Sequence, residues 1–240
     1  MTALKNLDDN EPTIDEAPLV GAAMILLGYL VEHQTIGLTK TGAFQRKFVL
    51  WAAQEFQWPD FDLERYFAVS KILNEYDYPP LEMLHFILQR LKLIRHYKGA
   101  CRLTKAGAGL ADKPGALFNL IAPLYLFQVD HAALSRLREP VLGNWDIFLG
   151  VLNEEAKHGV SCVELRHIFY GMPDPTEGID RVPFMIHDQI VKPLCWMGLL
   201  DKSSTDKNMH LEGRLYVRTP LWGAALNVPF EPVMVMPTRH

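Results

Sequence analysis

One local pattern occurs twice in this chain: an apolar helix, a polar turn and a short strand that returns before a glycine. The first copy runs from the helix end at residues 91–94 to Gly107, and the second runs from residues 197–200 to Gly223. Most of the remaining sequence has the apolar spacing of helices. We therefore expect a mainly α-helical protein with small β hairpins, built as two similar modules.

A short internal repeat indicates how one of the small sheets is paired. Residues 38–43 and 103–108 are identical at five of six positions, and in both a strand end is followed by a glycine and then a helix. Two such strands within one module can pair side by side. We expect these two segments to share a sheet.

The N-terminal region combines a polar stretch with a strongly apolar one. Residues 1–17 are acidic and contain Pro12, which predicts a mobile tail. Residues 19–30 form a helix that is apolar almost all round, and such a helix must be buried. Its partner is either its own chain, which we favour, or a second copy in a dimer.

The first module is expected to have three helices before its hairpin. Asp62 has a short polar side chain that can cap a helix start, and Pro80 suits the first turn of the third helix. The expected elements are a strand at residues 36–40, helices at 44–56, 62–74 and 80–91, a closing helix from Gly107 to about residue 111, and an apolar segment at 117–127 that is interrupted by Pro123.

The second module has clear helix-start signals. Asn144 can cap its first helix, and Ser161 with Glu164 forms a capping box at the start of its second. Pro183 begins the third helix, which Pro193 should kink or shorten. The expected hairpin arms are residues 199–203 and 215–219, and residues 228–236 can add an edge strand.

The order of helix, helix, third helix and hairpin resembles the winged-helix arrangement, a helix-turn-helix elaborated by a β hairpin. Residues 159–165 are similar to the turn that enters the second helix of many bacterial helix-turn-helix domains. Over most of residues 36–226 the chain therefore resembles tandem winged-helix proteins of the bacterial regulator type. We place the first module at residues 18–128 and the second at residues 140–240.

The first hairpin carries the strongest charge feature. Residues 90–113 hold seven basic residues and one acid, Asp112, in a chain whose net charge is -4. Basic wings contact phosphates in winged-helix proteins, and such contacts give affinity without reading sequence. The alternative is a solvated hairpin that balances residues 55–82, which hold seven acids and two bases.

The third helices are poor candidates for reading bases. Glu82 and Asp188 would face phosphates unfavourably, although His85 and several amides and cations on the same helices can donate to base edges. Met83, Phe86, Met185 and Trp196 either fill the core or are exposed for a protein partner. The candidate DNA-binding residues are Gln89, Arg90, Lys92, Arg95, Lys98, Arg102, Lys105, Gln189 and Lys192.

Several function classes have little support in the sequence. The three cysteines form no CxxC element, so reduced thiols are expected rather than a disulfide framework or a zinc knuckle. His158, Cys162 and His167 are expected to be core or surface residues and not a metal or thiol site. No phosphate-binding loop or hydrolase motif is present. We expect a cytoplasmic protein without catalytic activity, cofactor, metal or membrane segment.

Two hypotheses for function follow. The first is a DNA-associated protein, a transcriptional regulator or accessory factor, whose first wing contacts the phosphate backbone of double-stranded DNA. The second is a protein–protein interaction adaptor that keeps the winged-helix fold without binding DNA. The acidic third helices and the negative net charge favour the second. Either could form a homodimer.

Overall fold

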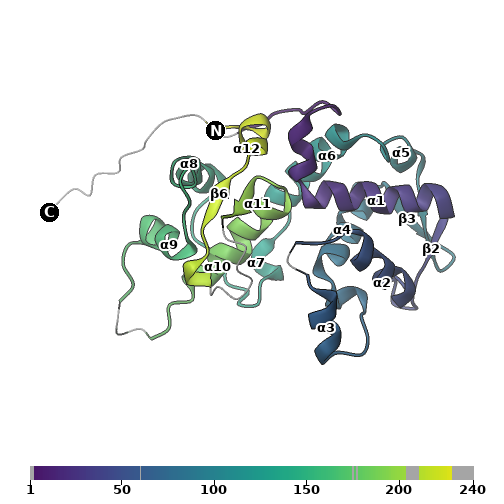
Figure 1. Cartoon of the computed structure of the whole chain (residues 1–240), viewed down its shortest axis with the longest axis horizontal. Coiled ribbons are helices and arrows are strands. Elements are labelled where there is room, and N and C mark those ends of the chain that lie inside the picture. Colours follow the sequence, from purple (N-terminus) through teal and green to yellow (C-terminus); the bar gives the residue numbers. More distant parts are fainter. Residues whose placement is uncertain (1–2, 60, 175, 177, 204–210, 229–240) are drawn as a thin grey trace.

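A computed structural model describes residues 3–59, 61–174, 176, 178–203 and 211–228 of the chain, which is mainly helical with three small antiparallel sheets (Figure 1). The first module contains, in order, α1 (Pro18–His33), β2 (Thr35–Gly37), α2 (Arg46–Glu55), α3 (Leu63–Val69), the 3-10 turn η2 (Glu75–Asp77), α4 (Pro79–Arg90), β3 (Ile94–Tyr97), β4 (Ala100–Leu103), α5 (Lys105–Ala108) and α6 (Pro114–Phe127).

The sheet of the first module pairs the strands that lead into the two repeated segments, but β2 ends at Gly37 and not at residue 40, so residues 38–43 lie beyond the strand. Its strand order is β2-β4-β3, so the second arm of the hairpin is the central strand. Ile36 lies opposite Cys101, which lies opposite His96, and these three positions share one face of the sheet. Thr35, Arg102 and Arg95 share the other face.

The N-terminal apolar helix is buried within its own chain, as favoured from the sequence. α1 packs on α6 and α4, and Leu19, Leu26 and Leu27 are completely buried. Since the helix fills the core of its own module, its apolar sequence does not require a second copy of the chain.

The elements around α4 differ from the expectation in length. Asp62 caps α3 by accepting from the Arg65 amide at 3.0 Å, but α3 ends at Val69 and not near residue 74. α4 starts at Pro79, one residue earlier than expected. Pro123 lies inside a continuous α6, where the helix was expected to be interrupted.

The second module repeats the order of the first. It contains α7 (His131–Leu134), α8 (Trp145–Glu155), α9 (Cys162–Tyr170), α10 (Val182–Ile186), the π-turn η3 (His187–Val191), α11 (Lys192–Trp196), β5 (Leu200–Lys202), the 3-10 turn η4 (Leu211–Gly213), β6 (Tyr216–Arg218), α12 (Pro220–Ala225) and β7 (Leu226–Asn227). Val160 pairs with Tyr216 of β6, which also pairs with β5. The second hairpin arm is therefore central in both modules.

The third helix of the second module accommodates its proline by a change of helix type. α10, η3 and α11 follow one another without a break from Val182 to Trp196. Pro193 has no N–H for the carbonyl of Gln189, and the wider π-turn lies immediately before it. The shortening that we considered at Pro193 is absent, since the helix continues to Trp196, and the change near the proline is a π-turn.

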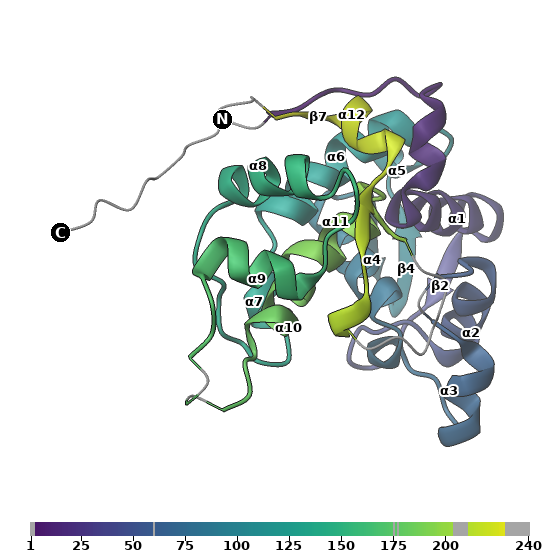
Figure 2. The same ribbon diagram turned by 60° about the vertical axis from the view of Figure 1, so that its left-hand side comes forward.

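Residues 3–17 are not the mobile tail that their composition predicts. β1 (Ala3–Leu4) pairs with β7, and the 3-10 turn η1 (Pro12–Glu16) leads into α1. Leu7 is buried, and its backbone exchanges two hydrogen bonds of 2.9 Å with the Asn119 side chain of α6. Figure 2 shows this segment, the N-terminal strap, running beside β7 and α12. Residues 229–236 of the expected edge strand lie outside the described residues.

The two modules share one hydrophobic core. Trp58 of the first module meets Trp196 of α11 edge to face, with ring centroids 5.1 Å apart, and Trp196 also stacks on Tyr125 of α6 at 6.1 Å. The strap and α12 extend the same contact, since η1 packs against α12. The third helix of the second module is therefore part of the boundary between the modules.

Candidate nucleic-acid interface

The turn between β3 and β4 fixes the shape of the first hairpin. Lys98 and Gly99 are its two central residues, with φ of 49° and 74°. Positive φ at both central residues is typical of the tight turns whose twist matches that of two antiparallel strands. The hairpin therefore projects as a short twisted ribbon with Lys98 at its tip.

The cations of the hairpin gather around one tyrosine. Arg95 and Arg102 are direct cross-strand partners on the outer face. Their guanidinium carbons lie 5.9 and 5.3 Å from the centroid of the Tyr97 ring, and the Lys98 ammonium lies 5.3 Å from it. Each distance falls in the range of cation–π attraction. Tyr97 is 44% exposed, so the ring holds three cations together at the surface.

These three cations are not neutralised by acidic side chains within the described part of the chain. The ion pairs found there involve other residues, and none includes Arg95, Lys98 or Arg102. Three of the seven acids in residues 55–82 make local contacts: Asp62 caps α3, Asp77 caps η2 and Glu75 contacts His85. The hairpin keeps its positive charge free for an external anion.

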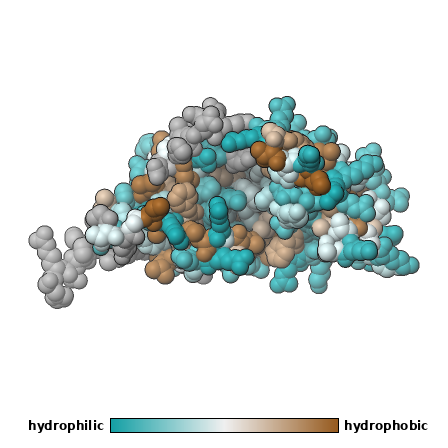
Figure 3. Space-filling view, turned by 90° about the horizontal axis from the view of Figure 1, so that it is seen from below, coloured by the Kyte–Doolittle hydropathy of each residue, from teal (hydrophilic) through white to brown (hydrophobic). Residues whose placement is uncertain are grey.

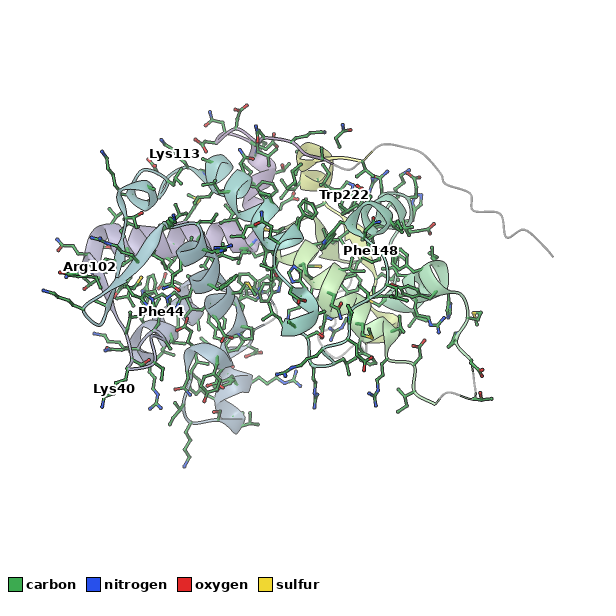
Figure 4. All side chains as sticks on the ribbon, turned by 180° about the vertical axis from the view of Figure 1, so that it is seen from behind. Lys40, Phe44, Arg102, Lys113, Phe148 and Trp222 are labelled. Atoms are coloured by element: carbon green, nitrogen blue, oxygen red, sulfur yellow. The ribbon has the colours of Figure 1, made fainter. Side chains whose placement is uncertain are left out.

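The remaining candidate DNA-binding residues of the first module extend this surface. Gln89 and Arg90 are exposed at the end of α4, and Lys92 and Lys105 are exposed at the base of the hairpin. The Thr104 hydroxyl donates to the Lys92 carbonyl at 2.8 Å, which places those two lysines beside each other. Figure 4 shows Arg102, Lys113 and Lys40 pointing outward from the end of the molecule opposite Phe148 and Trp222.

The second module does not present the residues predicted for it. Gln189 is buried, and both ends of its amide are used inside the chain: its Oε1 accepts from the Val141 amide at 3.0 Å and its Nε2 donates to the Glu139 carbonyl at 2.6 Å. Lys192 is half-buried, with its ammonium 5.0 Å from the Trp196 ring. The prediction that these two residues lie on the exposed face of a DNA-recognition helix was wrong, because this helix packs between the modules.

The large apolar residues of the two third helices are mostly core. Met185 and Trp196 are buried and Met83 is half-buried, whereas Phe86 of α4 is 50% exposed. Seen from below, the surface at the end that carries the first module is largely hydrophilic (Figure 3). Of these four apolar residues, only Phe86 is therefore exposed for contact with a protein partner.

The structure also assembles a chain of polar groups that sequence reasoning missed. His85 was expected on the outward face of α4, but it is 6% exposed and its Nδ1 lies 2.5 Å from Oε1 of the buried Glu75. Its Nε2 lies 2.8 Å from Nε2 of His96 on β3. The other Glu75 oxygen accepts from the Phe44 amide, and the Phe44 ring stacks on His85.

This Glu75–His85–His96 chain changes the electrostatics beneath the hairpin. Burial, and then the neighbouring His85, lower the pKa of His96, while Glu75 opposes them. Burial and Glu75 raise the pKa of the Cys101 thiol to about 12, so that cysteine stays protonated. Because Glu75, His85 and His96 come from three different elements, no residue spacing in the sequence predicts this Glu75–His85–His96 chain.

Other candidate sites gain no support from the described residues. No group of three histidine, cysteine or acidic side chains there could hold a metal ion. Cys162 is buried, and burial raises the pKa of its thiol to about 12. Among the helices described, none is both long and apolar enough to cross a membrane.

Comparison with known proteins identifies the family. One family model, the Y4jL N-terminal domain, matches residues 15–116, and another, the y4jL C-terminal domain, matches residues 135–220. The "Uncharacterized protein y4jL" of Sinorhizobium fredii (strain NBRC 101917 / NGR234) is 36% identical over 167 residues, which are 67% of this chain and 75% of that relative. The chain belongs to the y4jL family.

The two y4jL domains correspond to the two structural modules. The N-terminal domain contains α1 to the basic hairpin and α5, and the C-terminal domain contains α8 to β6. No solved structure matches the chain.

Proposed function

We propose that this member of the y4jL family consists of two winged-helix modules and associates with double-stranded DNA through the hairpin of the first. The pairing pattern supports the winged-helix assignment, because in both modules the segment before the second helix pairs with the second arm of the hairpin: strand β2 in the first module and the single residue Val160 in the second. The observation that carries the DNA proposal is the exposed cluster of Arg95, Lys98 and Arg102 around Tyr97.

The cluster favours binding to the phosphate backbone. Three cations gathered around one ring form a compact positive surface suited to phosphate groups, and each phosphate neutralised releases a counterion. α4 exposes Glu82, Phe86 and Gln89 on its free face, which offers little for base recognition. The proposed role is that of a regulator or accessory factor with weak sequence preference and no catalytic activity.

The direct test is the triple variant Arg95→Ala, Lys98→Ala, Arg102→Ala in a duplex-binding measurement at several salt concentrations. If all three residues contact phosphates, the slope of log affinity against log salt should become less negative by about 2–3. A matched control is the triple variant Lys71→Ala, Arg136→Ala, Arg181→Ala, which removes the same charge from exposed residues outside the hairpin. An equal loss of duplex affinity in both triple variants, or no duplex binding by the parent protein, would refute the proposal.

The exposed Phe86 favours the second candidate function, a protein–protein adaptor. Phe86 lies on the free face of α4 near Glu82, where an apolar anchor beside an acid suits a protein surface better than DNA. An adaptor predicts that Phe86→Ala abolishes co-purification of a stable partner while the triple hairpin variant retains it. Loss of duplex binding in the triple hairpin variant, with duplex binding retained in Phe86→Ala, favours the DNA proposal.

A further inference from the structure

The buried Glu75–His85–His96 chain lies directly beneath the basic hairpin and plays no part in the function proposed above. Glu75 and His85 are 5% and 6% exposed, whereas His96 is exposed. The chain therefore connects a buried carboxylate to a surface imidazole by two short contacts, 2.5 Å at Glu75 and 2.8 Å between the histidines.

The number of protons on the two imidazole rings determines whether the contact between their Nε2 atoms can persist. With both histidines neutral, His85 Nδ1–H donates to Glu75 and His96 Nε2–H donates to His85 Nε2. One added proton still leaves a single hydrogen between the two Nε2 atoms, so the contact survives. A second added proton puts a hydrogen on both Nε2 atoms. The contact of 2.8 Å must then open.

The surroundings determine which ring moves when the contact opens. His85 is fixed from two sides, because Glu75 accepts its Nδ1–H and the Phe44 ring stacks on it at 3.9 Å. His96 lies on a hairpin strand, is exposed, and has its ring near the backbone of Gly42, where a Cβ would lie 3.7 Å from the ring. The exposed ring of His96 is thus the one free to swing outward.

The charged and titratable groups around His96 come from several elements. α4 contributes His85, which contacts His96 directly. Glu82 of the same helix interacts with Glu75, and burial and Glu75 raise the pKa of the Glu82 carboxyl. η2 contributes Glu75, and β4 contributes Cys101, which is protonated. Arg95 and Lys98 flank His96 along the hairpin, and Arg95 lies on the opposite face of the sheet.

We propose that His96 is a proton-dependent anion contact of the hairpin, and that Glu75 and His85 are positioning residues that hold it inward until both histidines are protonated. This inference depends on the proposed phosphate binding. Protonated His96 adds a fourth cation to the hairpin that carries Arg95, Lys98 and Arg102, on the face opposite the two arginines. Since burial and His85 lower the pKa of His96, the added charge is present at acidic pH and is lost as pH rises through that lowered value.

The experiment measures the affinity of the full chain for a fluorescent duplex from pH 5 to pH 8 at constant ionic strength. Wild-type protein should bind about five- to tenfold more tightly at the acidic end, beyond any change shared with His96→Gln, because one more counterion is released. His96→Lys carries a permanent charge and should bind tightly at every pH, without this pH-dependent step in affinity. His158→Gln, which removes an exposed histidine of the second module, is the control and should keep the step.

A second measurement tests the positioning residues. Glu75→Gln removes the carboxylate that favours protonated His96, so the midpoint of the step should move to lower pH, and NMR titration of the His96 imidazole should show the same shift without DNA. Salt-dependent binding with an identical pH step in wild type and His96→Gln would overturn this inference and leave phosphate binding intact. Absence of binding at every pH, together with an unchanged His96 titration in Glu75→Gln, would overturn both.

Discussion

Gly198 shows how one residue can hold two parts of the molecule together. It follows α11 with φ of 72°, and a Cβ built on it would lie 2.2 Å from the carbonyl oxygen of Glu16 in the strap. An L-residue is disfavoured in that backbone conformation and would also collide with backbone. Glycine here therefore permits the close approach of the strap to the second module.

Gly198→Ala should lower the free energy of unfolding by at least about 1–2 kcal/mol, from the left-handed backbone alone. The measurement is chemical denaturation followed by tryptophan fluorescence. Gly223→Ala is the matched control, because no atom lies within 4 Å of its added Cβ and the residue is inside α12. An equal effect of the two substitutions would contradict the proposed close approach.

At the scale of elements, local capping chemistry decides where several helices start. Ser161 Oγ accepts from the Glu164 amide at 3.1 Å, and Glu164 Oε2 accepts from the Ser161 amide at 2.7 Å. This capping box starts α9 as the sequence predicts. Asn144 caps α8 in the same local way, by accepting from the Ile147 amide at 3.1 Å.

Ser161→Ala should destabilise the protein by about 1 kcal/mol, since it leaves an amide at the start of α9 without its acceptor. Ser161→Thr keeps a hydroxyl at the cap and should recover most of that loss. Thermal unfolding of the two variants provides the comparison. If both variants lose the same stability, packing of the buried Ser161 side chain and not capping is responsible.

At the scale of the whole molecule, the N-terminal strap joins the two ends of the fold. β1 pairs with β7 at the end of the second module, and Leu7 is fixed to Asn119 in the first. The Trp58–Trp196 contact adds a second connection between modules. These links predict that the two modules unfold together.

Leu7→Ala should lower the free energy of unfolding by about 2–4 kcal/mol, because it removes a buried side chain from a packed site. The control is Leu142→Ala, since Leu142 is 78% exposed and should cost little. Denaturant unfolding of both variants, monitored by fluorescence and far-ultraviolet circular dichroism, tests the effect and the shared transition. A neutral Leu7→Ala would mean that residues 3–17 behave as the mobile tail predicted from composition.

The sequence by itself determined the features that depend on neighbouring residues. The hairpins, the Asp62, Asn144 and Ser161 caps and the burial of α1 follow from local hydrogen bonds and apolar spacing, and all are present in the structure. The positive charge of the first hairpin is likewise local, because its cations are adjacent along two paired strands.

Tertiary structure alone decided which of these surfaces remain free and which polar groups meet. The sequence predicts an exposed amide at Gln189, but in the structure this amide bonds to the backbone of Val141 and Glu139. The acidic segment 3–17 is predicted to be solvated, but Asn119 and β7 bind it to the rest of the fold. Glu75, His85 and His96 form a chain because η2, α4 and β3 converge around Phe44. Such contacts depend on the packing of distant segments, which residue spacing does not encode.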